Sequence, residues 1–190
     1  MRLAAISKYI DLLLKWNARI NLTAIRAPEE IVQRHFGESF FAASHLLAEK
    51  SVKTAIDLGS GAGFPGVPFA LLAPEVEITL IESSQKKSTF LKELIYLLGL
   101  KNVKVFSGRA ESYSQSADLV MLRAVERFEE VVPLALSLVS ADGKLVLLIG
   151  TSQIELAKSL LTDVQWLEPL AIPSGHSRVL LFGTKVVKVE

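Results

Sequence analysis

The sequence predicts an α/β protein in which a helical cap, residues 1–50, precedes a doubly wound, mostly parallel sheet in residues 51–190. Two observations predict this fold. Beyond Lys50, short apolar runs alternate with helix-like segments, and such alternation is typical of a parallel sheet covered on both faces. Hydrophobic residues make up 50% of the 190 residues, and strands buried on both faces account for this excess. We expect the two parts to form one structural unit.

The cap is expected to contain two helices. Apolar residues recur at helical spacing from Leu3 to Leu13 and predict an amphipathic helix that ends near Asn21. A second helix should begin at Pro28, because proline fits a first turn and the two glutamates that follow it suit the positive end of the helix dipole. Its expected apolar stripe is Phe36, Phe40, Ala43 and Leu47.

Six strands and four helices are expected beyond the cap. The predicted strands span residues 54–58, 77–81, 103–106, 118–122, 144–149 and 178–182. The predicted helices span residues 67–72, 88–98, 129–139 and 153–161. Residues 164–170 are expected to add an antiparallel edge strand, which makes the sheet seven-stranded.

Composition excludes several classes of protein. The chain has no cysteine, which excludes disulfides, cysteine-ligated metals and cysteine nucleophiles. Its net charge of +1 argues against nucleic-acid binding by bulk charge, so any RNA contact needs a local patch. The longest uncharged run, residues 58–74, holds four glycines and three prolines, unlike a membrane span. The start of the chain lacks signal-peptide features, and we expect a cytoplasmic protein without metal or membrane contact.

A glycine-rich loop is the strongest local motif. A predicted buried strand ends at Asp57-Leu58 and runs into Gly59-Ser60-Gly61-Ala62-Gly63-Phe64-Pro65-Gly66, then into a predicted helix. Glycine permits a tight turn and close approach of the backbone to a ligand. Ligands of open α/β sheets bind at the carboxyl ends of the strands, where Glu82 also ends the second predicted strand. A carboxylate at that place can accept hydrogen bonds from ribose hydroxyls.

Two ligands compete for this loop. Gly61, Gly63 and Gly66 match the dinucleotide pattern G-x-G-x-x-G, which predicts NAD binding and an oxidoreductase. That match starts two residues late and leaves Asp57 and Gly59 unexplained. The pattern D-x-G-x-G-x-G is typical of S-adenosylmethionine (SAM)-dependent methyltransferases, and there Asp57 would complement the ammonium group of SAM. We favour SAM over NAD, and over a glycine-rich turn that binds nothing.

Residue types narrow the substrate of a SAM-dependent enzyme. Methylation at C5 of a pyrimidine generally needs a cysteine nucleophile, which is absent. The place after the fourth strand, where amino-group methyltransferases carry an Asn/Asp-Pro-Pro-aromatic motif, reads Leu122-Arg123-Ala124-Val125. An arginine there suits phosphate, carboxylate or the edge of guanine. Guanine N7 has a free lone pair, so its methylation requires positioning rather than a general base.

Spaced motifs occur along nearly the whole chain. They are Trp16-Asn17, Asn21-Leu22-Thr23-Ala24-Ile25, Arg34-His35-Phe36-Gly37-Glu38-Ser39, the loop from Asp57 to Pro68, Lys86-Lys87, Phe90-Leu91, Ser107-Gly108-Arg109-Ala110-Glu111 and Arg123-Ala124. Together they resemble one family, the bacterial 16S ribosomal RNA guanine-N7 methyltransferases, also called glucose-inhibited division protein B. The resemblance implies a Rossmann-like class I SAM-dependent methyltransferase fold. It also implies SAM as cofactor, S-adenosylhomocysteine as product, and a guanine in the decoding region of 16S rRNA as target. The substrate would be 16S rRNA, the 30S subunit or an assembly intermediate, and we expect a monomer.

The resemblance also implies roles for single residues. Gly59 and Phe64 would contact SAM from the loop, with Glu82 on the ribose. Ala110 and Glu111 would border the adenine. Arg123 would lie at the methyl-transfer site as the catalytic residue, and Asn21 and Arg109 would face RNA or organise the site. From its position after a strand, we expect Arg123→Ala to abolish activity and leave thermal unfolding nearly unchanged.

Other residues have plainer interpretations or depart from the family. His35 is interpreted as a buried or capping histidine, because nothing near it has metal-ligand spacing. Asn21 could instead close a turn. Ile149 stands where the family often carries a lysine, and Glu38 where aspartate is commoner. The missing lysine motivates one more alternative, a non-catalytic RNA-binding or assembly factor on a methyltransferase fold.

Overall fold

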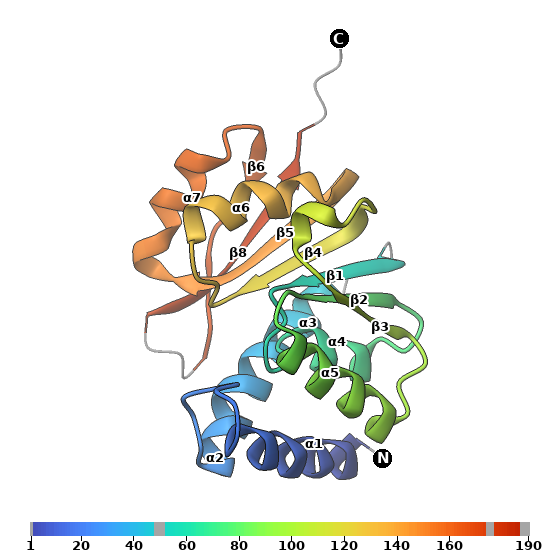
Figure 1. Cartoon of the computed structure of the whole chain (residues 1–190). Helices are drawn as coiled ribbons and strands as arrows, with labels where there is room; N and C mark the ends of the chain where they lie inside the picture. Colours follow the sequence, from blue (N-terminus) through green and yellow to red (C-terminus); the bar gives the residue numbers. More distant parts are fainter. Residues whose placement is uncertain (1, 48–51, 174–176, 187–190) are drawn as a thin grey trace.

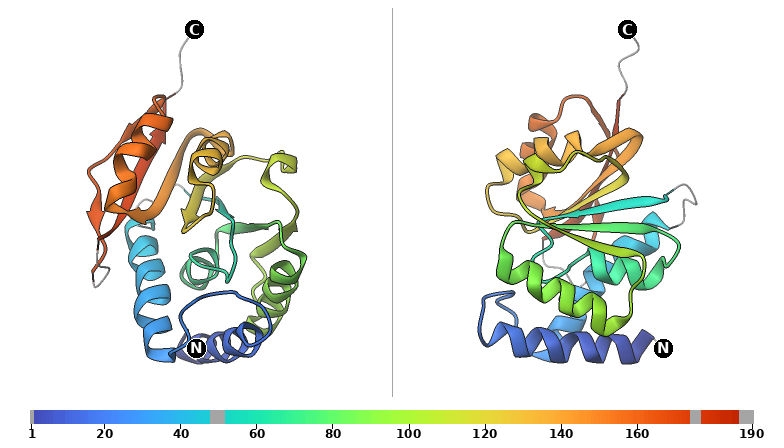
Figure 2. Two further views of the ribbon diagram at one scale, coloured as in Figure 1. Left: turned by 60° about the vertical axis from the view of Figure 1, so that its left-hand side comes forward. Right: turned by 45° about the vertical axis from the view of Figure 1, so that its right-hand side comes forward.

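A central sheet lies between two helical layers. The computed structural model describes residues 2–47, 52–173 and 177–186. Its helices are α1 (Arg2–Asn17), α2 (Pro28–Glu30), the π-helix Ile31–Phe36, α3 (Gly37–Leu46), α4 (Gly66–Leu72), α5 (Gln85–Leu98), the 3-10 helix Ala110–Ser112, α6 (Phe128–Ser137), the 3-10 helix Thr151–Gln153 and α7 (Ile154–Leu160). Helices α3, α4 and α5 cover one face of the sheet, and α6 and α7 cover the other (Figure 1). Helix α1 lies outside α5 and contacts it (Figure 2).

The sheet has the order β3-β2-β1-β4-β5-β8-β6, and β7 also pairs with β8. Its strands are β1 (Thr54–Leu58), β2 (Glu77–Glu82), β3 (Val103–Ser107), β4 (Ala117–Arg123), β5 (Val139–Gly150), β6 (Val164–Trp166), β7 (Leu170–Ala171) and β8 (Arg178–Lys185). Strands β1 to β5 pair in parallel, and β8 is antiparallel to β5. The chain order reverses between β1 and β4, so ligands are expected beyond the carboxyl ends of these two strands.

The edge of the sheet corrects the predicted strand count. Residues 164–170 were expected to form one strand, but β6 and β7 pair with successive parts of β8, which makes the sheet eight-stranded. Pro169 lies between the two short strands and has no N–H to donate to a ladder. The expected antiparallel edge is therefore present but interrupted.

The first helix is shorter than its periodicity predicts and ends at Asn17 instead of near Asn21. The Asn17 side chain explains the stop. Its Oδ1 accepts hydrogen bonds from the backbone N–H of Leu22 at 2.8 Å and of Thr23 at 3.1 Å, and its Nδ2 donates to the Thr23 carbonyl at 2.8 Å. Asparagine thus closes a turn that competes with further helix. The second helix begins at Pro28 as predicted.

Two apolar cores flank the sheet. The first contains side chains of α1, α3, α4 and α5 packed on the sheet, including Tyr9, Leu13, Phe36 and Phe69. The second joins α6 and α7 to the opposite face through residues such as Val132 and Ala157. Strand residues alternate between the two cores, as Leu119 and Met121 against Val120 and Leu122 show. The helical cap therefore shares its core with the sheet.

Tyr9 connects the cap to the glycine loop. Its hydroxyl donates to the Ala62 carbonyl at 2.6 Å, and its ring stacks on Phe64 with centroids 5.0 Å apart. Phe36 meets both rings edge-on at 5.1 Å. Tyr9 is fully buried, and burial raises the pKa of its hydroxyl well above the ordinary value, so it stays a donor. The cap thereby supports the conformation of the loop.

Within the ranges that the structure describes, no helix is long and apolar enough to cross a membrane.

Tyr9→Phe should lower the free energy of unfolding by about 1–3 kcal/mol, because it leaves the buried Ala62 carbonyl without its donor. For a chain of this length, that corresponds to a decrease in Tm of several degrees, measurable by circular dichroism. Tyr96→Phe is the matched control, because Tyr96 is 89% exposed. Equal Tm values for the two variants would contradict a supporting role of the Tyr9 hydroxyl.

Candidate active site

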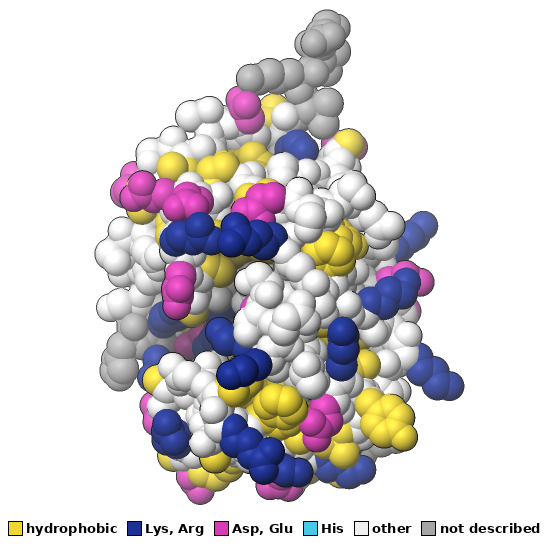
Figure 3. Space-filling model, in the orientation of Figure 1, with side chains coloured by type: hydrophobic (Ala, Val, Ile, Leu, Met, Phe, Trp, Pro, Cys, Tyr) yellow, Lys and Arg dark blue, Asp and Glu magenta, His cyan; other side chains and the backbone are white. Residues whose placement is uncertain are grey.

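A cleft of about 500 Å³ opens at the carboxyl ends of the parallel strands. Its lining includes residues 58–62, Phe64, residues 81–83, Lys87, residues 108–111 and residues 123–127. On the cap side, Leu22, Thr23 and His35 complete it. In the orientation of Figure 1, Figure 3 shows Lys and Arg side chains gathered around a hollow between the part formed by α6 and the part formed by the cap. Loops from both halves of the sheet therefore converge on one site.

Close packing explains two of the glycines in the loop. Gly63 has φ +91°, and a Cβ there would lie 2.6 Å from the Tyr9 hydroxyl. A Cβ on Gly66 would lie 2.6 Å from Asp57 Oδ2 and 2.5 Å from Leu80. These two glycines face the protein interior, whereas Gly59 and Gly61 line the cleft. Of the loop glycines expected to contact SAM, Gly59 and Gly61 therefore line the cleft, whereas Gly63 packs against Tyr9.

Asp57 lies beneath the loop rather than in the cleft. It is 1% exposed and does not belong to the cleft lining. Its Oδ2 accepts a hydrogen bond from the Gly66 N–H at 3.0 Å, while Oδ1 is buried without a partner among the described residues. Burial raises the pKa of Asp57 to about 7, against the lowering by the hydrogen bond from Gly66. This geometry favours fastening of the loop over the expected contact with the ammonium group.

Glu82 occupies the position expected of a ribose-binding carboxylate. It ends β2 and lines the cleft. Its Oε2 accepts from the Gly61 N–H at 2.9 Å and its Oε1 from the Ser84 N–H at 2.7 Å. These bonds fix the carboxylate and leave it lone pairs that can accept from a ligand. The two bonds therefore hold the loop in place and fix the orientation of the Glu82 carboxylate.

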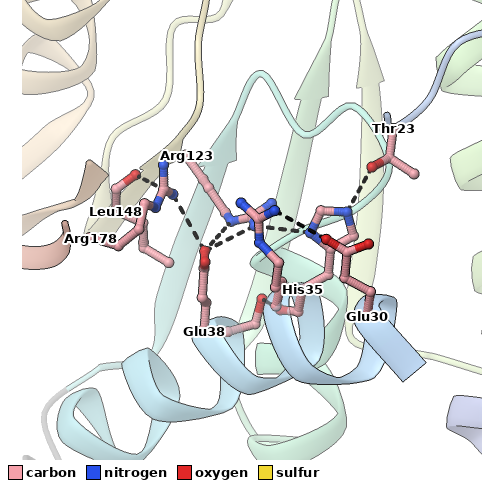
Figure 4. Close-up of polar contacts among 9 residues, drawn as sticks. Thr23, Glu30, His35, Glu38, Arg123, Leu148 and Arg178 are labelled. Atoms are coloured by element: carbon pink, nitrogen blue, oxygen red, sulfur yellow. Dashed lines mark hydrogen bonds and ion pairs between the residues drawn. The ribbon is translucent and has the colours of Figure 1, made fainter. Parts of the chain in front are cut away.

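Arg123 is held by a buried carboxylate from the cap. Glu38 is 3% exposed, and its Oε2 accepts from Arg123 Nη2 at 2.9 Å and Nε at 3.1 Å (Figure 4). Arg178 Nη2 approaches the same oxygen at 3.4 Å and also donates to the Leu148 carbonyl at 3.1 Å. This cluster joins α3 to the ends of β4, β5 and β8. Arg123 lies at the cleft, with its side chain 11% exposed.

His35 lies between Arg123 and the cap loop, in the π-helical stretch. Its Nδ1 is 2.9 Å from Arg123 Nη2, and its Nε2 is 2.7 Å from Thr23 Oγ1 (Figure 4). Burial, followed by the nearby arginines, lowers its pKa to about 3, so the imidazole is neutral. The interpretation of His35 as a buried histidine agrees with its 7% exposure. Its contacts, however, make it part of the site.

The other predicted residues lie at different distances from the cleft. Arg109 is exposed on its rim, and Ala110 and Glu111 line it. Asn21 is exposed and is absent from the cleft lining. The Asn17 side chain, by contrast, fixes the loop that carries Thr23, and the role expected of Asn21 stays a prediction.

Sequence reasoning missed Glu38, Thr23 and Asn17 as site residues. A signal for Glu38 exists, because it shares a helical face with the buried Ser39, Ala42 and Leu46. A carboxylate on an apolar face requires a cationic partner.

The structure also explains the isoleucine at position 149, where the family often carries a lysine. Ile149 is 3% exposed, packs in the second core and pairs with Val179, so it does not reach RNA.

The cleft fits SAM. Gly59 and Gly61 place backbone without side chains along its wall, and Glu82 presents a carboxylate at the end of β2. Solved structures are similar in fold. A putative SAM-dependent methyltransferase from Methanococcus maripaludis gives a TM-score of 0.67 at 15% identity, covering 84% of this chain and 91% of that one. A ribosomal protein L11 methylase from Lactobacillus delbrueckii gives 0.66 at 14%, covering 78% and 77%. The fold and site define a class I SAM-dependent methyltransferase.

The family follows from sequence comparison. The family model described as rRNA small subunit methyltransferase G matches residues 2–178, and this chain belongs to that family. A relative of that name from Streptococcus sanguinis is 34% identical over 186 residues, covering 91% of this chain and 78% of the relative. Another from Chromobacterium violaceum is 38% identical over 147 residues, covering 76% and 69%. The resemblance found in the spaced motifs is confirmed.

The raised pKa of Asp57 predicts a pH-dependent stability. Between the ordinary pKa of 3.8 and the folded value of about 7, the folded state binds more protons than the unfolded state. The contribution of Asp57 is therefore fully present below about pH 4 and is lost as pH rises through about 7. Urea unfolding at pH 4.5 to 7.5 should show the free energy of wild type falling relative to Asp57→Asn, by an amount on the order of a few kcal/mol. Parallel curves for the two proteins would refute the raised pKa.

The buried ion pair changes the expectation for Arg123→Ala. This substitution leaves Glu38 buried with Arg178 at 3.4 Å, so the free energy of unfolding should fall by about 3 kcal/mol instead of staying unchanged. Adding Glu38→Gln should recover part of that loss, because the uncompensated charge disappears. Arg127→Ala is the control, since its pair with Glu130 is exposed and such pairs contribute less than about 1 kcal/mol. Urea unfolding that shows equal losses for Arg123→Ala and Arg127→Ala would contradict the structural role.

Proposed function

We propose that this protein methylates N7 of a guanine in 16S ribosomal RNA, in the decoding region of the small subunit. The observation that carries the proposal is the arrangement of Arg123 beside the glycine loop. Arginine has five N–H donors. Nε and both Nη2 hydrogens face Glu38 and His35, and Nη1 has no partner among the described residues. A fixed guanidinium with a free edge at the cleft suits an acceptor-rich nucleotide.

The chemistry needs little more than positioning. SAM supplies an electrophilic methyl group on a sulfonium when bound. The N7 lone pair forms the new N–C bond as the C–S bond breaks, and positive charge moves from sulfur to the guanine ring. No proton leaves N7, so no general base is needed. The chain then has to align the acceptor with the methyl group, which is catalysis by proximity and orientation.

Different residues at the cleft bind SAM, shape the floor of the site and contact the target nucleotide. Glu82 would accept hydrogen bonds from the ribose hydroxyls of SAM. Gly59 and Gly61 would let the backbone approach SAM, and Ala110 and Glu111 would border its adenine. Phe64 is 5% exposed beneath the loop and shapes the floor of the site. Arg123 is the catalytic residue, because its Nη1 donates to an acceptor of the target nucleotide other than N7.

RNA contacts would come from the rim of the cleft. Lys87, Arg109, Arg123 and Arg127 all line it. A local group of cations is what a chain with a net charge of +1 needs for phosphate contacts. The substrate would be 16S rRNA, the 30S subunit or an assembly intermediate. The protein would act as a monomer in the cytoplasm.

The two alternatives from the sequence are not favoured. The NAD-dependent oxidoreductase rested on Gly61, Gly63 and Gly66, but Gly63 and Gly66 are required by packing against Tyr9 and Asp57. The non-catalytic assembly factor rested on Ile149, which is a core residue here. Membership in the methyltransferase family supports catalysis over both.

In vitro methylation tests the proposal. Labelled SAM, the purified protein and either 30S subunits or naked 16S rRNA from cells that lack this activity should give label in one guanine, released as N7-methylguanine. Arg123→Lys keeps a charge opposite Glu38 but loses the planar fork, and we expect its kcat to fall at least about tenfold.

Calorimetry supplies the control for the alternatives. S-adenosylhomocysteine should bind and NADH should not. Label in protein, or at a position other than guanine N7, would overturn the substrate. Tight binding of NADH without binding of S-adenosylhomocysteine would overturn the methyltransferase.

A further inference from the structure

Thr23 lines the cleft and reaches the arginine cluster through His35. Its Oγ1 is 2.7 Å from His35 Nε2, and His35 Nδ1 is 2.9 Å from Arg123 Nη2 (Figure 4). A continuous chain of hydrogen bonds thus runs from Glu38 through Arg123 and His35 to Thr23.

The direction of these hydrogen bonds is fixed by the guanidinium. Arginine nitrogens donate and never accept, so the nitrogen that faces Arg123 Nη2 must present a lone pair. His35 Nδ1 is therefore unprotonated. A neutral imidazole then carries its proton on Nε2, and the burial and positive surroundings of His35 keep it neutral. Nε2–H consequently donates to Thr23 Oγ1.

The Thr23 hydroxyl can form one further hydrogen bond, as a donor. A hydroxyl has two acceptor lone pairs and one hydrogen to donate. His35 Nε2–H donates to its oxygen, and so does the Ile25 backbone N–H at 3.1 Å. With both lone pairs used, the O–H is left as a donor, and no acceptor for it lies among the described residues. Toward the cleft, Thr23 can donate a hydrogen bond but not accept one.

We propose that Thr23 determines base specificity by donating this hydrogen bond to O6 of the target guanine. The inference rests on the proposed function and deepens it. Guanine presents two acceptors, N7 and O6, on this edge, whereas adenine presents N7 and the N6 amino donor. With N7 turned to the methyl group, O6 is the neighbouring acceptor. An adenine would place its amino group against a hydroxyl that cannot accept.

This chain of hydrogen bonds also gives a role to the buried polar side chains that lead to the Thr23 hydroxyl. Arg123 sets the tautomer of His35, and Glu38 sets the orientation of Arg123. If His35 carried its proton on Nδ1 instead, Nε2 would accept from Thr23 and the hydroxyl would have no hydrogen left for the substrate. Glu38 and Arg123 thus make the Thr23 hydroxyl a hydrogen-bond donor toward the cleft, although they act on it only through His35.

The test compares two bases at the methylated position. After the target is mapped with wild-type protein, that guanine is replaced with 2,6-diaminopurine, which keeps N7 and the 2-amino group but carries an amino group in place of O6. The quantity measured is the ratio of kcat/KM for guanine to kcat/KM for diaminopurine. Wild type should show a ratio of at least about 10 to 100, the size of one base-edge contact.

The variants are Thr23→Val, Thr23→Ser and, as matched control, Thr89→Val. Thr23→Val keeps the shape and removes the hydroxyl, so the ratio should fall about tenfold, mainly through lost activity on guanine. Thr23→Ser should restore most of it. Thr89 is exposed on α5, and its hydroxyl donates to the Gln85 carbonyl, so its loss should leave the ratio unchanged. Binding of S-adenosylhomocysteine verifies each fold, and Thr23→Ala replaces a valine variant that fails this check.

The outcomes separate the inference from the proposed function. A wild-type protein that transfers no methyl group to guanine N7 overturns both. Methylation at guanine N7 together with an unchanged ratio in Thr23→Val overturns the role of Thr23 alone. A merely structural Thr23 would lower kcat/KM for both bases in proportion, which again leaves the ratio unchanged. A ratio that falls equally in the serine variant also contradicts a hydroxyl donor.

Discussion

The carboxylate of Glu38 is a charge in the core, and its neutralisation fixes the geometry of the site. A buried carboxylate without a partner would cost several kcal/mol, so the cap and the sheet must meet where Arg123 and Arg178 can reach it. That requirement sets the position of α3 against the ends of β4, β5 and β8. It also places Arg123 and His35 in the lining of the cleft, where they contact each other. The proposed specificity therefore depends on the same cluster as the stability.

Hydrogen bonds with three side chains hold the glycine loop in place. Asp57 accepts from Gly66, Glu82 accepts from Gly61, and the Tyr9 hydroxyl donates to the carbonyl of Ala62. Each bond uses a backbone group of the loop that a buried turn cannot leave unpaired. These bonds hold the backbone of the loop in the conformation that lines the cleft. Such preorganisation lowers the entropy that ligand binding has to overcome.

Net charge is a poor guide to RNA binding in this protein. Acidic and basic residues nearly cancel over the chain, yet Lys87, Arg109, Arg123 and Arg127 share one cleft. Glu38 compensates the charge of the buried Arg123. In the proposed function, the rim residues contact phosphates, and Arg123 and Thr23 contact the base. Phosphate contacts position a nucleic acid and base contacts specify it.

The sequence by itself determined the alternating α/β fold, the ends of the six main strands to within five residues, and the loop from Asp57 to Gly66, because periodicity and glycine spacing are local properties. It also singled out Glu82 and Arg123, which end β2 and β4 and line the cleft, and the roles given to them stay predictions. It assigned Asp57 to the ligand and Asn21 to the site, and it passed over Glu38 and Thr23. Only the tertiary structure shows where these four residues lie, because burial and pairing over as many as 140 positions, as between Glu38 and Arg178, leave no local pattern.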